Sequence, residues 1–159
     1  MTLHELLNMG APILSDGAMG TYYAQLADAQ AACCEFANLD NPELIRHIHR
    51  EYVKAGARFL RTNTFAANTA ALGMPLTDII DIIKSGYNIA YEAADGQAVV
   101  AADIGPIYMQ EIGSPLDEYY TIADTFIACG AKTFIFETFA DTEFIAPVSS
   151  HIKHRVPDA

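Results

Sequence analysis

The chain has 159 residues, of which 52% are hydrophobic, and its formal net charge is −11 at pH 7. This length can form one domain with a real core but not two, and the hydrophobic content excludes a disordered chain. The negative charge argues against nucleic acid as a partner, and no apolar stretch approaches the roughly 20 residues that span a bilayer.

The first elements follow one another closely. Residues Leu3 to Asn8 predict a short helix, and Pro12 to Ser15 predict a first strand. The segment Asp16 to Thr21 then closes that strand, and residues Tyr22 to Asp40 predict a short helix and a loop.

Two further helix–strand pairs come next. Asn41-Pro42-Glu43 is typical of a helix start, and Gly56 suits the end of that helix. The second strand is predicted at Phe59 to Thr62. Thr77 is expected to cap a helix from Asp78 to Ala94, and the third strand is predicted at Ala98 to Ala102.

The last elements repeat the alternation. Ser114-Pro115-Leu116-Asp117 predicts the start of a helix that runs to Gly130. The fourth strand is predicted at Thr133 to Phe136. Residues Asp141 to His154 begin like a helix, but Pro147 interrupts the pattern, so we expect this helix to be short or kinked.

Each of the four apolar runs ends in a polar residue, namely Asp16, Asn63, Asp103 and Glu137. Parallel strands that are buried on both faces read as apolar runs. In a (β/α) barrel, the groups that act on a substrate lie at the carboxyl ends of the strands. The pattern therefore predicts that these four side chains share one rim.

Two segments of the chain look like copies of each other. The first copy consists of Ala55-Gly56-Ala57-Arg58, the run Phe59, Leu60, Arg61 and the segment TNTF. The second copy consists of Cys129-Gly130-Ala131-Lys132, the run TFIF and the segment ETF. A repeated supersecondary unit favours a fold built from such units, although helix, Gly-Ala and strand also occur in other α/β proteins. A complete eight-unit barrel takes about 250 residues. We therefore predict an α/β chain that supplies about the first four units of a (β/α)8 TIM barrel, with residues 1–159 as its amino-terminal half and no second domain.

The densest motif is the segment DGAMGT, which comprises Asp16, Gly17, Ala18, Met19, Gly20 and Thr21. Two glycines directly after a strand let backbone N–H groups point into a common space and hold an anion such as a carboxylate. The segment has neither the P-loop nor the GxGxxG pattern. A tight turn in which Asp16 caps its own backbone is the alternative.

The other strand-end residues also have two readings each. Glu137 follows three large apolar residues, so its carboxylate needs a cationic partner or hydrogen bonds, which a substrate ammonium or a helix terminus would provide. Asn63 offers a donor and an acceptor, or it bridges neighbouring loops. Asp103 stands at a loop start, where aspartate is common anyway.

We expect no metal site within the chain. Cys33 and Cys34 are adjacent, but no nearby residue supplies further ligands, and the pair His151 and His154 stands in a polar tail. The odd number of three cysteines suits a reducing compartment, and the start of the chain lacks the basic region of a signal peptide. We therefore expect a cytoplasmic protein.

Five segments carry a family resemblance, in this order: DGAMGT, NPELIRHIHREYVKAGA, TNTFAAN, DIGP and ETFADTE. Together they resemble the homocysteine-binding domain of the zinc-dependent homocysteine S-methyltransferases, from about Ile13 to Glu143. The likeness is greatest to cobalamin-dependent methionine synthases and to homocysteine methyltransferases fused to a methylenetetrahydrofolate reductase.

The resemblance implies a (β/α)8 barrel that transfers a methyl group to the sulfur of homocysteine. It implies that Asp16 and Glu137 face the ammonium of the amino acid and that the amides of Gly17 through Thr21 take its carboxylate. It also implies that Asn63 shapes the floor of the site or orients these groups. Asp103 joins them as a residue of the substrate-binding rim.

The resemblance also implies zinc, which binds and deprotonates the thiol. In the family the zinc cysteines belong to the second half of the barrel, so we expect the ligands downstream of residue 159, and no catalytic residue within the chain. The sequence leaves the methyl donor open: cobalamin or methyltetrahydrofolate bound by other domains, S-methylmethionine, S-adenosylmethionine and betaine are the alternatives.

Three hypotheses follow. In the first, the chain is the homocysteine-binding half of a methyltransferase and is inactive alone. In the second, it is a non-catalytic half-barrel that pairs with another chain through open sheet edges. In the third, it belongs to another barrel enzyme that binds an amino acid.

Overall fold

The computed structural model describes residues 2–27, 33–108 and 114–159. Helix α1 (Leu3–Leu7) begins with a capping box, in which the Thr2 side chain accepts from the Glu5 N–H and the Glu5 carboxylate accepts from the Thr2 N–H. The predicted strand at 12–15 is reduced to one parallel bridge between Ser15 and Phe59.

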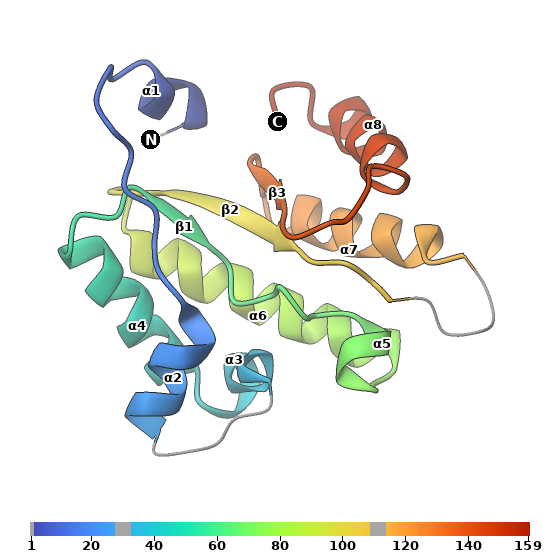
Figure 1. Cartoon of the computed structure of the whole chain (residues 1–159), viewed down its shortest axis with the longest axis horizontal. Helices are drawn as coiled ribbons and strands as arrows, with labels where there is room; N and C mark the ends of the chain where they lie inside the picture. Colours follow the sequence, from blue (N-terminus) through green and yellow to red (C-terminus); the bar gives the residue numbers. More distant parts are fainter. Residues whose placement is uncertain (1, 28–32, 109–113) are drawn as a thin grey trace.

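Three strands form a parallel sheet in the order β1 (Phe59–Arg61), β2 (Val99–Ile104) and β3 (Phe134–Phe136). The Ser15 bridge adds the preceding segment beside β1, so the four segments lie in chain order (Figure 1). The predicted α/β class with parallel strands is confirmed. Strand β2 runs on through Asp103 to Ile104, so Asp103 belongs to the strand and not to the loop after it.

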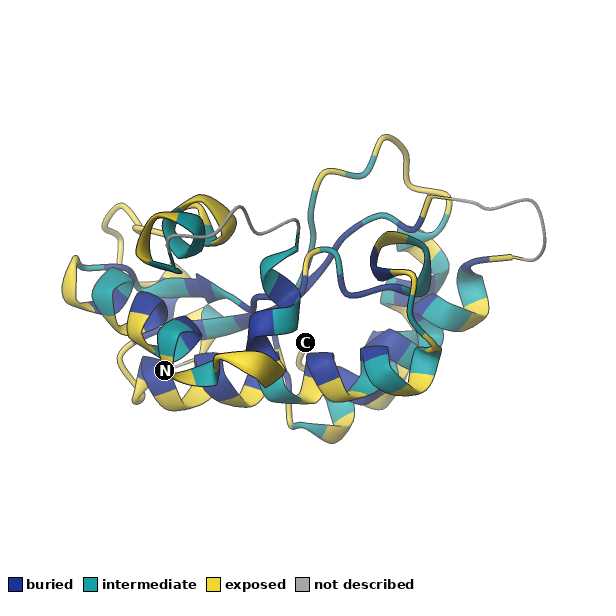
Figure 2. Ribbon diagram, turned by 90° about the horizontal axis from the view of Figure 1, so that it is seen from below, coloured by how far each residue is buried: buried dark blue, intermediate teal, exposed yellow. Residues whose placement is uncertain are grey.

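Three long helices, each followed by a strand, cover one face of this sheet: α4 (Pro42–Lys54), α6 (Leu76–Ala94) and α7 (Leu116–Ala128). Their outer edges are exposed while their inner sides are buried (Figure 2). Leu60 is fully buried against Val53 and Ala94, on the helix side of β1. Because strand side chains alternate, its neighbour Arg61 points to the opposite, uncovered face.

The main core lies between α6, α7, β2 and the last helix, α8 (Ile145–Arg155). Ile83, Tyr119 and Phe126 are among its largest fully buried side chains. Burial of such side chains stabilises a fold by about 1.5–3 kcal/mol each. This core fixes the positions of β2 and β3, whose carboxyl ends carry Asp103 and Glu137.

Several element boundaries differ from those predicted. Helix α6 begins at Leu76, directly after Pro75, so Thr77 is inside the helix and bonds to the Asp78 carboxylate instead of capping. Helix α8 begins at Ile145, which puts Pro147 in the first turn, where no intrahelical N–H donor is needed. Of the two predicted alternatives, a short or a kinked helix, the shorter helix is observed, since α8 starts after the predicted Asp141.

Short helices fill the segments between the predicted elements. They are α2 (Met19–Ala27), the 3-10 helix η1 (Cys34–Phe36), α3 (Ala37–Asp40) and α5 (Thr69–Leu72). The first three divide the predicted helix and loop at 22–40, of which residues 28–32 lie outside the described part. Helix α5 was not predicted, although Asn68 caps it by accepting from the Ala71 N–H. None of the helices in the described part of the chain is long and apolar enough to cross a membrane.

Candidate functional site

Two of the acidic residues expected at the rim bind one arginine of the chain itself. The Arg61 Nη1 atom donates to both carboxylate oxygens of Glu137, at 2.8 and 2.9 Å, and its Nε atom donates to Asp16 Oδ1 at 3.0 Å. The Nη2 atom donates to the Gly17 carbonyl at 3.2 Å. Arg61 therefore joins the end of the first segment to the end of β3.

Asp16 holds the base of Arg61 in place. Its Oδ2 atom accepts from the Arg61 backbone N–H at 2.8 Å, while Oδ1 accepts from the guanidinium. The Asp16 side chain is only 4% exposed, whereas those of Arg61 and Glu137 are 26% and 29% exposed. The Asp16 end of this cluster is thus structural in character, and the Glu137 end is open to solvent.

The Arg61 guanidinium is held in its charged form. Partial burial alone would lower its pKa, but the hydrogen bonds and negative charges of Asp16 and Glu137 outweigh burial and raise the pKa of Arg61. Two carboxylates therefore share one permanent positive charge.

Asp103 is the third acid of the cluster, and the charges of Glu137, Arg61 and Asp16 all act on its carboxyl group. It is buried, and its Oδ1 atom has no hydrogen-bond partner among the described residues. Burial, followed by the neighbouring Glu137 carboxylate, raises the pKa of Asp103 to about 8. A buried carboxyl group with an unpaired oxygen is costly, so this position invites a proton or a cation.

The backbone of Asp103 is fixed by two threonines of the TNT segment. Thr64 Oγ1 lies 2.8 Å from the Asp103 carbonyl, which can only accept, so Thr64 donates there. Thr62 Oγ1, 2.6 Å from Thr64 Oγ1, must therefore donate to Thr64 and accept from the Asp103 N–H at 3.0 Å. The two hydroxyl groups lock the carboxyl end of β1 onto that of β2.

Asn63 takes part in a different network. Its Nδ2 atom donates to Asn38 Oδ1 and to the Cys34 carbonyl, both at 2.9 Å, and its Oδ1 atom accepts from the Cys34 thiol. Asn38 in turn donates to the Asn63 carbonyl at 2.8 Å. The structure thus places Asn63 as a bridge between β1 and the segment of η1 and α3, while the three acids gather around Arg61.

The segment Gly17 to Thr21 leads directly from this cluster into a helix. Because α2 begins at Met19, the N–H groups of Met19, Gly20 and Thr21 lie in its first turn, where helical partners are absent by geometry. A Cβ atom on Gly17 would stand 2.8 Å from the hydroxyl of Tyr52, which donates to the Ala18 carbonyl. Only glycine allows this approach.

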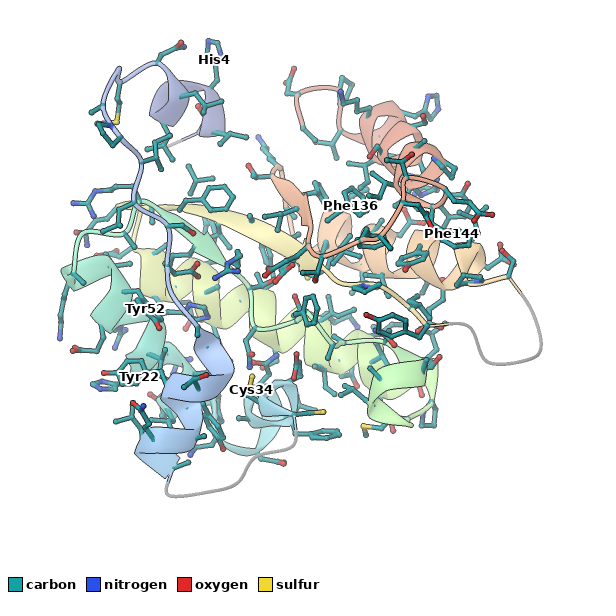
Figure 3. All side chains as sticks on the ribbon, in the orientation of Figure 1. His4, Tyr22, Cys34, Tyr52, Phe136 and Phe144 are labelled. Atoms are coloured by element: carbon teal, nitrogen blue, oxygen red, sulfur yellow. The ribbon has the colours of Figure 1, made fainter. Side chains whose placement is uncertain are left out.

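Aromatic side chains support the same segment from α4. The rings of Tyr22 and Tyr52 meet edge to face with their centroids 6.0 Å apart (Figure 3). Such pairs contribute about 0.5–1.5 kcal/mol beyond their buried area. The contact between Tyr22 and Tyr52 therefore holds the start of α2 against α4.

The sequence interpretation missed Arg61 and Asn38. Arg61 was grouped with the apolar run of its strand, although a charged residue at the tip of a buried strand is itself a signal that acidic partners lie nearby. Asn38 carries no comparable signal, because its partners Asn63 and Ile82 are distant in sequence.

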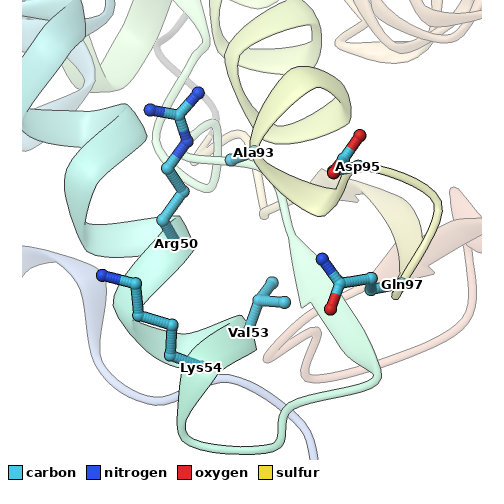
Figure 4. Close-up of a pocket in the computed structure, with 6 residues that line it drawn as sticks. All are labelled: Arg50, Val53, Lys54, Ala93, Asp95 and Gln97. Atoms are coloured by element: carbon cyan, nitrogen blue, oxygen red, sulfur yellow. The ribbon is translucent and has the colours of Figure 1, made fainter.

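A pocket of about 210 Å³ lies at the other end of β2 from Asp103 (Figure 4). It is lined by residues from the ends of α4 and α6 and from the turn into β2, namely Arg50, Val53, Lys54, Ala93, Asp95 and Gln97. None of the residues expected at the rim lines it, so this pocket is separate from the acidic cluster.

Comparison with known proteins gives consistent results. The sequence model of the family described as Homocysteine S-methyltransferase matches residues 13–156. A methionine synthase of Mycobacterium leprae is 38% identical over 94 residues, which cover 52% of this chain and 8% of that protein. A homocysteine S-methyltransferase of Escherichia coli is 27% identical over 148 residues, which cover 79% of this chain and 46% of that protein.

Among solved structures, the metallated form of the homocysteine methyltransferase MmuM from Escherichia coli matches with a TM-score of 0.78 and 22% identity. The match covers 99% of this chain and 64% of that one. The described fold therefore matches part of a homocysteine methyltransferase barrel, and the barrel class that the strand pattern predicted is confirmed. The chain spans less than half the length of the curated relatives it matches.

Proposed function

This chain belongs to the homocysteine S-methyltransferase family, and we propose that it forms the part of such an enzyme that binds the amino acid homocysteine. In this proposal the intact protein is a methyltransferase that methylates the homocysteine sulfur to give methionine. The three unpaired cysteines of the chain suit a reducing, cytoplasmic setting for this reaction.

The observation that carries the proposal is the charge imbalance beside Asp103. Asp16 and Glu137 share the single charge of Arg61, and the Asp103 carboxyl group is buried next to Glu137 with an unpaired oxygen. A substrate ammonium placed between Glu137 and Asp103 would supply the missing positive charge and hydrogen-bond donors. It would also favour the ionised form of Asp103, so its binding would release a proton.

The N–H groups at the start of α2 are the proposed partners of the substrate carboxylate. They belong to Gly17 through Thr21, and the helix dipole adds a favourable potential for an anion there. Arg61 contacts both the Gly17 carbonyl and Glu137, so this end of α2 and the acidic cluster adjoin each other. An α-amino acid carries an ammonium and a carboxylate on the same carbon atom, so adjoining sites of opposite character suit it.

The described residues do not fit the zinc ion expected of the family. Among residues 2–27, 33–108 and 114–159, no three His, Cys, Asp or Glu side chains are grouped so that they could hold a metal ion. Cys34 is an unsuitable ligand, because burial, followed by the charge of Glu35, raises the pKa of its thiol to about 12. We therefore assign this chain substrate binding only, and leave zinc and a cobalamin or folate methyl donor to other parts of the proposed enzyme.

Titration of the chain with L-homocysteine under reducing conditions, followed by calorimetry or NMR, tests the proposal. We expect weak but saturable binding to wild type and a loss of about tenfold or more in affinity for Glu137→Gln, since a charge-assisted hydrogen bond contributes about 1.5–3 kcal/mol. Glu143→Gln, which neutralises an exposed acid outside the cluster, is the matched control and should bind like wild type.

Three results would count against the proposal. Equal affinity of wild type and Glu137→Gln would remove the acidic cluster from the site. Methyl transfer to homocysteine by the chain alone in the presence of zinc would show that it does more than bind. Equal binding of L-homocysteine and L-homoserine, which lacks the sulfur, would favour another amino-acid-binding barrel enzyme.

A further inference from the structure

We propose that Arg61 determines the specificity of the site by pairing with the substrate carboxylate, so that the site accepts an α-amino acid and discriminates against a simple amine. This inference rests on the proposed function and assigns a residue to it that the family resemblance did not indicate. Three features of Arg61 support it: its position, its partners and its fixed stem.

The Arg61 guanidinium lies between the two places where the charged groups of the substrate are expected. Its Nη1 atom is 2.8 Å from a carboxylate oxygen of Glu137, on the proposed ammonium side. Its Nη2 atom is 3.2 Å from the Gly17 carbonyl, on the proposed carboxylate side. A zwitterion placed across this point would present each charge to an opposite one.

Binding of a zwitterion would replace the ion pair between Arg61 and Glu137 by two ion pairs with the ligand, so that no charged group is left without a partner. Without ligand, Glu137 is paired with Arg61, and Asp103 Oδ1 has no partner in the described part of the chain. With ligand, the ammonium pairs with Glu137 and Asp103, and the Nη atoms of Arg61 pair with the ligand carboxylate. A simple amine can form the ion pair with Glu137 and Asp103, but it has no carboxylate to pair with Arg61. It therefore competes with Arg61 for Glu137 and offers Arg61 no new acceptor in return.

Arg61 can make this exchange because only its outer end is needed for it. The backbone N–H and Nε atoms of Arg61 are both bound to Asp16, whose side chain is 4% exposed. The Arg61 side chain as a whole remains 26% exposed. The stem is therefore anchored by the buried Asp16, while Nη1 binds the more exposed Glu137. The planar fork of arginine suits a carboxylate in a way that a lysine ammonium does not.

The test compares two ligands on two proteins. The ligands are L-homocysteine and 3-aminopropanethiol, which keeps the amine and the thiol but lacks the carboxylate, and the proteins are wild type and Arg61→Gln. We expect wild type to prefer homocysteine by tenfold or more. In Arg61→Gln this preference should fall at least tenfold, because affinity for homocysteine falls while affinity for the amine is kept or rises.

Arg61→Lys guards against a folding artefact, since loss of Arg61 leaves the buried Asp16 carboxylate without a cation. Lysine keeps the charge but loses the fork, so the preference should fall by about threefold in a protein that unfolds like wild type. An unchanged preference in folded Arg61→Lys and Arg61→Gln would overturn the inference and leave the proposed function standing. Failure of wild type to bind homocysteine at all would overturn both.

Discussion

Asp103 is a buried carboxyl group that should make the stability of the protein depend on pH near neutrality. Burial and Glu137 raise its pKa to about 8, and Arg61 and Asp16 are the other charged groups that face it. The folded protein therefore holds a proton that the unfolded chain releases near its ordinary value of 3.8. The stability that this proton contributes is complete below that value and is lost as pH rises through about 8.

We therefore expect the free energy of unfolding of wild type to fall by about 1–2 kcal/mol between pH 6.5 and 8, relative to Asp103→Asn. The asparagine is uncharged at every pH and should remove this part of the dependence. Urea denaturation of both proteins at several pH values measures the difference. Parallel curves for the two proteins would show that Asp103 is ionised in the folded state.

His49 should act in the opposite direction at acidic pH. It is fully buried on α4, and neither ring nitrogen has a hydrogen-bond partner among the described residues. Burial lowers its pKa from 6.5 to about 4, so the stability it permits is complete above 6.5 and is lost as pH falls through 4.

The variant His49→Leu should consequently gain stability relative to wild type as the pH falls from 6.5 to 4, by up to about 3 kcal/mol. His47→Leu, on the exposed side of the same helix, controls for the loss of a histidine as such. Acid denaturation followed by circular dichroism measures both. If His47→Leu gained as much as His49→Leu, burial would not be the cause.

The sequence predicted where the acidic residues of the cluster lie, but not which residue binds them. Asp16, Asp103 and Glu137 could be predicted to meet, because strand ends in a parallel sheet share one edge. The need of Glu137 for a cation was also predictable, but the cation is supplied by Arg61, whose long side chain reaches two strands. Which of several partners a long side chain binds depends on distances that only the folded chain defines.

Among the helices, α6 contains a glycine that the structure explains. Gly86 costs up to about 1 kcal/mol relative to alanine by helix propensity alone. A Cβ atom at Gly86 would stand 2.5 Å from Asn38 Nδ2 and 2.9 Å from Thr64 Cγ2. The Asn38 amide passes over this point to bond with the carbonyls of Asn63 and Ile82. The glycine therefore makes room for the network that ties α3 and β1 to α6.

Gly86→Ala should destabilise the protein by about 2 kcal/mol, because displacement of the Asn38 amide outweighs the gain in helix propensity. Gly20→Ala is the matched control within α2, since among the described residues its Cβ atom would meet only Cys34 Sγ, at an ordinary 3.7 Å. That change should be neutral or stabilising by up to about 1 kcal/mol. Thermal and urea denaturation measure both, and a stabilised Gly86→Ala would mean that the Asn38 network is dispensable.

Elements with strong start and stop signals were predictable, and elements defined by pairing were not. The helix after Asn41-Pro42 and the one before Gly130 lie close to their predicted positions, because proline at a helix start, glycine after a helix end and apolar periodicity are local signals. The side-chain cap predicted at Asn41 does not form, since this N-cap residue makes no side-chain cap hydrogen bond. The first segment forms only the Ser15 bridge, because the chain leaves the sheet soon after it and enters α2 at Met19. Helix α8 escaped the expected kink because it starts late enough for Pro147 to lie in its first turn.

In the part of the chain that the structure describes, α4, α6 and α7 cover one face of the sheet and leave the face that carries Arg61 without a helix layer. In the described residues, β3 pairs with β2 on one side, and the segment at Ser15 pairs with β1 on one side. Open edges of this kind invite pairing with another chain. The net charge of −11 opposes contact between two copies, and the acidic cluster on the uncovered face adds to this repulsion.

Ionic strength should therefore control self-association. The Debye length falls from about 10 Å at 0.1 M salt to about 3 Å at 1 M, which weakens charge repulsion but leaves backbone pairing at a sheet edge unaffected. We expect a monomer in dilute buffer and a growing fraction of dimers or larger species at 0.5–1 M sodium chloride, measured by analytical ultracentrifugation at several protein concentrations. Circular dichroism at the same salt concentrations should show an unchanged fold, which distinguishes edge pairing from aggregation of unfolded chains. If the protein stayed monomeric at every salt concentration, something other than charge would protect the sheet edges. If association decreased with added salt, charges would attract the copies instead of separating them.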